Sequence, residues 1–547
     1  MTDAHDRYDE AEIARFYADG LWRRRSLYDE AVAQAEARSD KRFVFDSTTS
    51  LTYAELRERA LRIAVGLHRR GIRRGDRVVV QLPNWTEFPV LAVAIARIGA
   101  ILVPVMPIYR RAEVEHIVQH SGAVLAVTAG EFRRFDHVAM FQNLPPTDLR
   151  EIIAVRAEED RSAGATPLAA IVAEGSRGDL EAEIEGLDGD PDDGFLIIYS
   201  SGTTSAPKGC FHTLNTVRST ALVMADSFGY TEHDVQFGPS PVAHGAGLVH
   251  SILLPMLTGA SSHLMEIWDP KDALRRIAEH RLTAAAGATT FLQMMLDAHR
   301  PGAHDLSSLR YWACAGSPIP APVIERASTV FPQTRWLSVY GRSENFLTTM
   351  CRLEEPPERA VTSDGAALAG AVVQVVGPDG RELPRGEEGD IAYRGPSHML
   401  EYYRDPEQTA ALFTTAGMSR SGDLGTMDED GFVRVTGRKS DIVIRGGMNI
   451  SAQELESHLA GHPRLAALAV VPMPDDRLGE KVCVYAVPRD SGPLTLDDVN
   501  DHLRGLGVAT QKLPEHLEVV REIPMTATGK VQKHVLRADI EQKLAAR

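Results

Sequence analysis

The chain has 547 residues, of which 44% are apolar and 24% charged, so it is long enough to form more than one globular domain. Its formal net charge of −16 excludes nucleic acid as the main partner, because binding a phosphate backbone requires a basic face. A membrane span is not expected either, since the most apolar stretch, residues 88–106, contains Arg97 and two prolines.

The cysteines and the N-terminus indicate a reducing compartment. The cysteines stand far apart in the sequence and form no CxxC pair, which argues against structural zinc and against a disulfide framework. The first seven residues are polar and predict no secretory signal. We therefore expect a cytoplasmic protein. The cysteines are Cys210, Cys314, Cys351 and Cys483.

Helical and strand patterns alternate from about residue 50 onward. Thr52 and Glu55 form a capping-box pattern, and the apolar residues that follow recur on one helical face until Gly71. The apolar helical face comprises Leu56, Ala60, Ile63 and Leu67. The alternation of helical and strand patterns predicts an α/β fold with layered, mainly parallel sheets. The next expected elements are a strand at 78–80, a helix over about 85–98 and a strand at 100–105, with similar helix–strand pairs at 274–286, 291–299 and 323–337.

From about residue 372 the pattern changes to short strands separated by Gly and Pro turns, which predicts a small β-rich subdomain. A helix capped by Ser451 and Glu454 and two further strands then predict a compact α+β unit. The expected strands lie at 372–376, 389–393, 431–435, 467–471 and 482–487. We expect a large N-terminal domain at 1–437 with its β-rich subdomain at about 372–437, a hinge at 438–441, and a small C-terminal domain at 442–547.

A loop rich in hydroxyl side chains follows the apolar strand 195–199. Backbone N–H groups and hydroxyls in such a loop can surround phosphate oxygens, while a lysine adds positive charge. The glycine and lysine spacing of a Walker loop is absent. The residues that we expect to bind phosphate are Ser200, Ser201, Gly202, Thr203, Thr204 and Lys208.

Several segments, in this order along the chain, resemble the adenylate-forming superfamily of acyl- and aryl-CoA synthetases, peptide-synthetase adenylation domains and luciferases. The resemblance covers about residues 50–535, and its appearance is closest to cyclohexanecarboxylate-type and aryl-acid CoA or AMP ligases. It implies a mobile C-terminal lid that rotates about Ser440 between two half-reactions. The segments are 199–209, 315–318, 340–344, 421–425, 437–438 and 524–530.

The resemblance implies roles for the nucleotide-binding residues. The ring of Tyr340 would pack on adenine, the hydroxyl of Ser343 would contact the α-phosphate, and Glu344 with Thr204 would hold Mg²⁺, which prefers oxygen ligands. Asp423 would accept hydrogen bonds from the ribose. The remaining expected nucleotide-binding residues are Gly316 and Ser317 at the adenine pocket, Gly341 and Arg342, and Arg438 near the ribose and phosphates.

The resemblance also implies the catalytic residues. Lys530 would stabilise the charge that develops when a carboxylate attacks the α-phosphate, as an electrostatic catalyst. His244 would stand as a gate at the acyl pocket. Relatives that activate dihydroxybenzoate carry Asn after this histidine, whereas this chain has Gly245, which removes a donor for a ring hydroxyl.

Some positions depart from the family pattern. Arg342 replaces a small or apolar residue beside the expected acyl pocket; it would favour a dicarboxylate or a small anion there, or form a salt bridge to Glu344. The conservative or local departures are Ser200 and Ser343 in place of threonine, Ser205 in place of glycine, and Met448 in place of glutamate.

These residues predict an ATP-dependent acid–CoA ligase, which forms acyl-AMP and pyrophosphate and then a thioester. ATP, Mg²⁺ and coenzyme A would be its cofactors, and a small or medium carboxylic acid its substrate. One alternative is an adenylation enzyme that loads the thiol of a carrier protein. Another is activation of a small oxyanion such as nitrite for an amine acceptor, as a diazotase would do. A further alternative is a non-enzymatic ATP-binding module. Lys530 argues against it, because binding of the nucleotide alone does not require this lysine.

Overall fold

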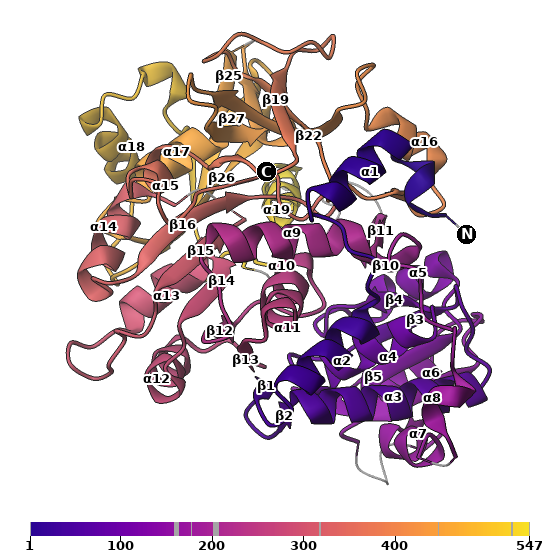
Figure 1. Cartoon of the computed structure of the whole chain (residues 1–547). Helices are drawn as coiled ribbons and strands as arrows, with labels where there is room; N and C mark the ends of the chain where they lie inside the picture. The colour runs from indigo at the N-terminus through magenta and orange to yellow at the C-terminus, as the bar shows by residue number, and fades with distance from the viewer. Residues whose placement is uncertain are drawn as a thin grey trace.

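Two large sheets, both mainly parallel, form the framework of the N-terminal part of the chain (Figure 1). In each sheet the central pairs are parallel and antiparallel pairs occur towards the edges, which confirms the predicted α/β class. The computed structural model describes residues 2–157, 163–176, 178–200, 207–316, 319–446, 448–526 and 529–545.

The first sheet carries the strands whose carboxyl ends meet the candidate site. In spatial order its described strands are β18 (Ala366–Ala367), β17 (Thr349–Met350), β16 (Arg335–Tyr340), β15 (Tyr311–Ala315), β14 (Ala284–Ala288), β12 (Val235–Gly238), β13 (Ser261–Leu264), β1 (Arg42–Phe45) and β2 (Ser50–Thr52). The second sheet has the order β21 (Glu401–Tyr402), β11 (Gly209–Thr213), β10 (Gly194–Tyr199), β4 (Ile101–Pro104), β3 (Arg77–Gln81), β5 (Leu125–Ala129), β8 (Glu151–Val155) and β9 (Thr166–Pro167).

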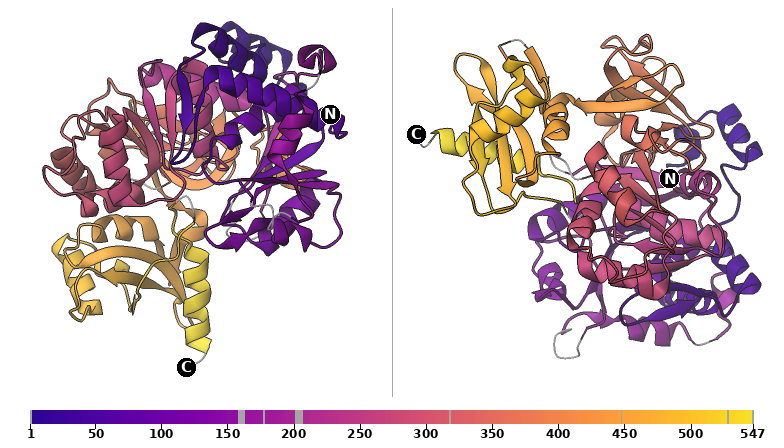
Figure 2. Two further views of the ribbon diagram at one scale, coloured as in Figure 1. Left: turned by 90° about the horizontal axis from the view of Figure 1, so that it is seen from below. Right: turned by 90° about the vertical axis from the view of Figure 1, so that its left-hand side faces the viewer.

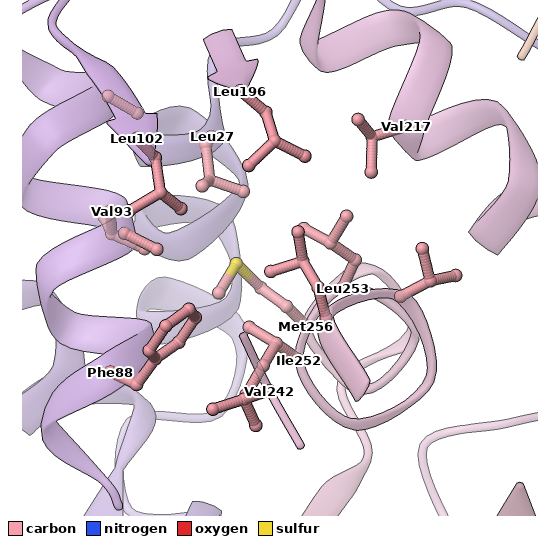
Figure 3. Packing of buried hydrophobic residues seen from close by; sticks show 14 of the residues in the cluster. Leu27, Phe88, Val93, Leu102, Leu196, Val217, Val242, Ile252, Leu253 and Met256 are labelled. Atoms are coloured by element: carbon pink, nitrogen blue, oxygen red, sulfur yellow. The ribbon is translucent and has the colours of Figure 1, made fainter. Parts of the chain in front are cut away.

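A hydrophobic core joins the second sheet to the helices beside it. Figure 3 shows side chains from several helices gathered near Leu102 of β4 and Leu196 of β10. Each fully buried aliphatic or aromatic side chain contributes about 1.5–3 kcal/mol. This core therefore fixes α9 and η3, which line the candidate site. The helices that contribute labelled side chains are α2 (Leu27–Ala37), α4 (Glu87–Arg97), α9 (Leu214–Ser227), the π-helix η3 (Leu248–Leu253) and α11 (Leu254–Thr258).

The predicted first helix is confirmed as α3 (Tyr53–Arg69). The side chain of Thr52 accepts from the N–H of Glu55, and the Glu55 side chain accepts from the N–H of Thr52. The predicted apolar face is buried. The other helix–strand pairs are found as α4 with β4, α12 (Pro270–His280) with β14, α13 (Thr289–Ala298), and α14 (Ala321–Val330) with β16.

The predicted β-rich segment forms a separate antiparallel sheet. Its last strand begins at Val433, two residues later than the expected start, because Gly431 adopts a φ of 86° in a turn closed on Asp428. Its strands are β19 (Val372–Val376), β20 (Gly389–Arg394), β22 (Ser419–Met427) and β23 (Val433–Arg438).

The C-terminal part of the chain forms another sheet covered by helices, to one side of the two large sheets (Figure 2). The short 3₁₀ helix η4 (Lys439–Asp441) connects it to β23, at the place where the sequence predicts the hinge. The hinge and the domain limits stay predictions. The elements are β24 (Ile442–Arg445), β25 (Met448–Ser451), α17 (Ala452–Leu459), β26 (Leu465–Asp475), β27 (Gly479–Pro488), α18 (Leu496–Gly505), β28 (His516–Val519) and α19 (Lys533–Ala545).

Candidate active site

Two adjoining cavities lie at the carboxyl ends of β14, β15 and β16, where ligands commonly bind in parallel sheets. The first, here called the acid cavity, has a volume of about 90 Å³ and extends to helices α9 and η3. The second, the nucleotide cavity, has a volume of about 80 Å³ and extends to β22 and β23. Both are lined by Gly316, Val339, Gly341 and Lys530.

Lys530 reaches this junction from the C-terminal part of the chain. A turn in which Thr526 and Lys530 exchange two hydrogen bonds, of 2.7 and 3.0 Å, holds its backbone. Thr290 donates to the carbonyl of Gly529 at 3.1 Å and so connects this turn to α13, the helix that follows β14 of the first sheet. Gly316 has a φ of 91°, and a Cβ there would stand 2.9 Å from Lys530 Cε. Glycine at 316 therefore leaves the space that the lysine occupies.

The charge state of Lys530 depends on its surroundings. Burial and the neighbouring Arg438 lower the pKa of its ammonium, while Asp423 and Glu344 raise it. Within the described ranges, no hydrogen bond or ion pair is recorded for Nζ. A group with these properties is available to an anionic ligand.

Asp423 connects two of the other predicted nucleotide-binding residues. It lies on β22 directly opposite Arg438 of β23, whose Nε donates to Oδ1 at 2.7 Å. The hydroxyl of Tyr340 donates to the other carboxylate oxygen at 2.7 Å. All three line the nucleotide cavity. The structure thus brings the carboxylate and the aromatic ring to one cavity, and their contacts with a nucleotide stay predictions.

Glu344 is the candidate magnesium ligand. Tyr402 of β21 donates to Oε1 at 2.5 Å, and the ammonium of Lys208 lies 5.0 Å from the centre of the Tyr402 ring. The positive charge of Arg342 and the Tyr402 hydrogen bond lower the pKa of the Glu344 carboxyl against the opposing effect of burial. An ionised oxygen ligand of this kind fits Mg²⁺, which takes one or two carboxylates and completes its shell with phosphates and water. Among the described residues, no group of three or more His, Cys, Asp or Glu side chains is placed to hold a metal ion.

The predicted phosphate loop is described only at its two ends. Ser200 donates its backbone N–H to the carbonyl of Lys208 at 2.9 Å, so the loop begins and ends at one point beyond β10 and β11. Ser201, Gly202, Thr203 and Thr204 lie outside the described residues, as does Ser317. Ser343 lines the acid cavity, and its carbonyl accepts from His212 Nε2 at 2.8 Å.

His244 lines the acid cavity together with Lys530. Burial and the charge of Lys530 lower the pKa of His244 to about 4, so the imidazole is neutral at physiological pH. Beside it, a Cβ on Gly245 would lie 2.8 Å from the ring of Phe346. Phe346 itself holds a φ of 54°, a strained conformation for a bulky residue that is typical of binding sites. A side chain at 245, such as asparagine, would therefore require this ring to move.

Arg342 lines the acid cavity but directs its terminal nitrogens elsewhere. Nη1 donates to the carbonyl of Arg420 at 2.7 Å, and Nη2 contacts Ser419 of β22. Nε is buried and has no hydrogen-bond partner among the residues that the structure describes. Neither sequence interpretation foresaw this arrangement: the guanidinium is held by β22, and among the described contacts no ion pair within 4.0 Å joins it to Glu344.

Several residues at the site were missed by sequence reasoning. Asp364 is buried in the nucleotide cavity, where it accepts from Ser338 and from the N–H of Val435, each at 2.9 Å. Gln453 of α17 donates to the carbonyl of Val435 at 2.9 Å. Tyr402 was missed too. Their importance arises from contacts between segments distant in sequence, and no local pattern marks them.

Comparison with known proteins gives consistent results over most of the chain. The model of the AMP-binding enzyme family matches residues 31–403, and that of the AMP-binding enzyme C-terminal domain matches 454–530. The chain is 35% identical to the medium-chain fatty-acid–CoA ligase of Escherichia coli (98% of this chain, 94% of the relative). It is 31% identical to the 2,3-dihydroxybenzoate-AMP ligase of Bacillus subtilis (98% and 97%).

A solved structure shows the same fold. The crystal structure of the anthranilate CoA ligase AuaEII in complex with anthranoyl-AMP matches with a TM-score of 0.86 at 24% identity, over 95% of this chain and 98% of that one. The likeness to AuaEII thus extends over both the large sheets and the C-terminal sheet.

In the part of the chain that the structure describes, every helix is too short or too polar to cross a bilayer.

Proposed function

Because the chain belongs to the family of AMP-binding enzymes, we propose that it joins a small carboxylic acid to the thiol of coenzyme A. It is an AMP-forming ligase, and it uses ATP to activate its acid as acyl-AMP. Its fatty-acid–CoA and aryl-acid relatives support an acid as the first substrate and a thiol as the acceptor. The four cysteines are buried and unpaired, which supports the cytoplasmic location that we propose with it.

The observation that carries this proposal is the position of Lys530, which lines both the acid cavity and the nucleotide cavity. An acid held in the first cavity would face the α-phosphate of a nucleotide held in the second. A carboxylic acid is already ionised at neutral pH, so its attack needs no general base. The pKa of His244, lowered to about 4 by burial and by Lys530, makes its imidazole a weak base, which is compatible with such an attack.

The chain's own residues would then orient the reactants and stabilise charge. Asp423 and Tyr340 would fix the ribose and the adenine, and Lys530 would stabilise the charge on the entering oxygen and on the leaving pyrophosphate. Mg²⁺ held by Glu344, with Thr204 as the second expected ligand, would neutralise phosphate charge when bound. His244 and Phe346 would exclude water from the acyl-AMP.

Pyrophosphate release over a panel of carboxylic acids, each with and without coenzyme A, tests the proposal. We expect magnesium-dependent pyrophosphate with at least one acid alone, and a thioester with AMP once coenzyme A is added. Activity that requires a carrier protein in place of coenzyme A would contradict the acceptor. Release of orthophosphate and ADP with every acid would contradict the proposed reaction.

The lowered pKa of Lys530 predicts the alkaline limit of adenylation. The ammonium is the active form, so kcat/KM for acyl-AMP formation should fall as the pH rises through a pKa below the ordinary lysine value of 10.5. A guanidinium stays charged throughout this range. Lys530→Arg should therefore retain part of the activity and lose the alkaline decline. A pH profile of kcat/KM for both proteins measures this, and the same decline in both would exclude Lys530 as its origin.

The proposed hinge predicts a selective defect. Proline at position 440, within η4 (Lys439–Asp441), restricts the backbone rotation that would carry the C-terminal part between the two half-reactions. Ser440→Pro should slow thioester formation about tenfold or more while acyl-AMP formation changes little. Ser440→Ala is the matched control. Separate assays of the two half-reactions measure the effect, and equal losses in both would count against a hinge here.

A further inference from the structure

We propose that His212 limits the size of the acid, because its buried imidazole holds the ring of Phe346 in the wall of the acid cavity. His212 is thus a specificity-determining residue that acts through Phe346 and does not itself contact the acid. The proposal rests on the acid activation proposed above. It predicts that removal of the imidazole lets the cavity admit larger acids while the reaction stays the same.

The ring of Phe346 lines the acid cavity, and the backbone beside it is held in place. The hydroxyl of Ser397 donates to the carbonyl of Asn345 at 2.9 Å, and the side-chain amide of Asn345 donates to the hydroxyl of Thr348 at 3.0 Å. Asn345 and Thr348 flank Phe346 in the sequence and are buried. With its backbone fixed, Phe346 can change the shape of the cavity only by a rotation of its side chain. The neighbouring side chains therefore decide where the ring stands.

His212 of β11 packs against this ring. The two ring centres lie 4.6 Å apart, and the ring planes make an angle of 51°. His212 is fully buried, and the described residues that line the acid cavity do not include it. Phe346 is only half-buried and does line the cavity. The imidazole thus supports the phenyl ring from outside the cavity.

Hydrogen bonds fix the imidazole in turn. Because a carbonyl can only accept, His212 Nε2 donates to the carbonyl of Ser343, at 2.8 Å, and Nδ1 lies 3.2 Å from the hydroxyl of Thr216. Burial lowers the pKa of His212 to about 4, so the ring is neutral at physiological pH and keeps this one N–H. A side chain that is held at both nitrogens in a close-packed interior resists displacement when an acid presses on Phe346.

The acid cavity is small, so a movement of one ring changes which acids it admits. Its volume is about 90 Å³. His212→Ala would leave a void beside Phe346, and a side chain next to such a void relaxes partly into it. A single methylene in an apolar pocket changes specificity about 10–200-fold. We therefore expect His212→Ala to shift the preference towards longer or wider acids.

Pyrophosphate release over two series of acids of increasing size tests the proposal. The probes are straight-chain acids from acetate to dodecanoate, and benzoate with its 4-methyl, 4-ethyl and 4-butyl derivatives. The size ratio is defined as kcat/KM for the next larger acid divided by kcat/KM for the best acid of the unaltered protein. His212→Ala should raise this ratio about tenfold or more. His212→Gln, which keeps the length of the side chain and an N–H donor, should restore most of the original preference.

A second substitution shows whether His212 acts through Phe346. Phe346→Ala removes the ring and should raise the size ratio by itself. Adding His212→Ala to it should then change the ratio by less than about twofold, because the contact between the two side chains no longer exists. An undiminished effect of His212→Ala in the Phe346→Ala protein would overturn the assigned link.

His137→Ala is the matched control for loss of a buried histidine. The ring of His137 is also fully buried and lies 4.9 Å from that of Phe135, and neither residue belongs to the described lining of the acid cavity. The size ratio should therefore not change in His137→Ala. An equal rise there would attribute the effect to a general loosening of the fold and would overturn the proposal.

The outcomes separate this proposal from the proposed function. An unchanged size ratio in folded His212→Ala would overturn the proposal and leave acid activation intact. The same holds if the unaltered protein uses dodecanoate and 4-butylbenzoate as well as every smaller acid. Pyrophosphate release with none of the acids would count against the proposed function and, with it, against the role of His212. Thermal unfolding shows which variants are folded, and His212→Asn, with its shorter polar side chain, provides a second test of the same rise.

Discussion

Replacing Lys530 with alanine should lower the rate of acyl-AMP formation by about 10²–10³-fold, the loss expected when one preorganised charge-stabilising group is removed. The ammonium stands where the two cavities meet, so it would contact both the entering carboxylate oxygen and the leaving pyrophosphate. The effect should lie in kcat, because this charge develops mainly in the transition state. Pyrophosphate release at saturating acid and ATP is the measurement.

The same substitution should barely change the stability of the fold. Burial disfavours the ammonium of Lys530, as its lowered pKa indicates, and the described structure records no hydrogen bond for Nζ that alanine would remove. Lys533→Ala is a matched control, because Lys533 is also a lysine of this part of the chain but forms an ion pair with Glu456 at 2.8 Å. Pyrophosphate release that is unaltered in Lys530→Ala, or equally reduced in Lys533→Ala, would refute the assigned role.

Much of the fold and of the reacting end could be predicted because short local patterns determine them. The cap at Thr52, the buried runs of the parallel strands and each single motif are formed by residues that are neighbours in the sequence. Motifs as far apart as Gly316, Tyr340, Asp423 and Lys530 meet at the ends of parallel strands, as the resemblance implied. The roles of these residues in catalysis stay predictions.

The wall of the acid cavity that α9 and η3 form could not be predicted in this way. Thr220 of α9 and His250 of η3 line this wall because the two helices pack against each other, which no local pattern indicates. The guanidinium of Arg342 likewise found partners on β22, about eighty residues further along the chain, which no sequence spacing indicates. Contacts of this kind depend on how the β-rich sheet sits against the large sheets, and that is a property of the whole fold.

Replacing Glu344 with glutamine should reduce acyl-AMP formation at least a hundredfold and raise the Mg²⁺ concentration needed for half-maximal rate. The amide keeps an oxygen that can accept from Tyr402 but loses the negative charge that a hard cation requires. Metal-bound phosphate groups gain several kcal/mol of charge stabilisation, which sets the size of the loss. The measurement is a magnesium titration of pyrophosphate release.

Tyr402→Phe distinguishes a metal ligand from a merely structural carboxylate. It removes the 2.5 Å hydrogen bond to Glu344 but leaves the carboxylate in place, so the rate should fall less than in Glu344→Gln, and the half-saturating Mg²⁺ concentration should change little. If Glu344 served only to hold β21 through Tyr402, Glu344→Gln, which keeps the acceptor oxygen, would lose no more activity than Tyr402→Phe at any Mg²⁺ concentration. A shift in the Mg²⁺ requirement that is confined to Glu344→Gln indicates that the carboxylate acts on the metal, because only that variant removes its charge.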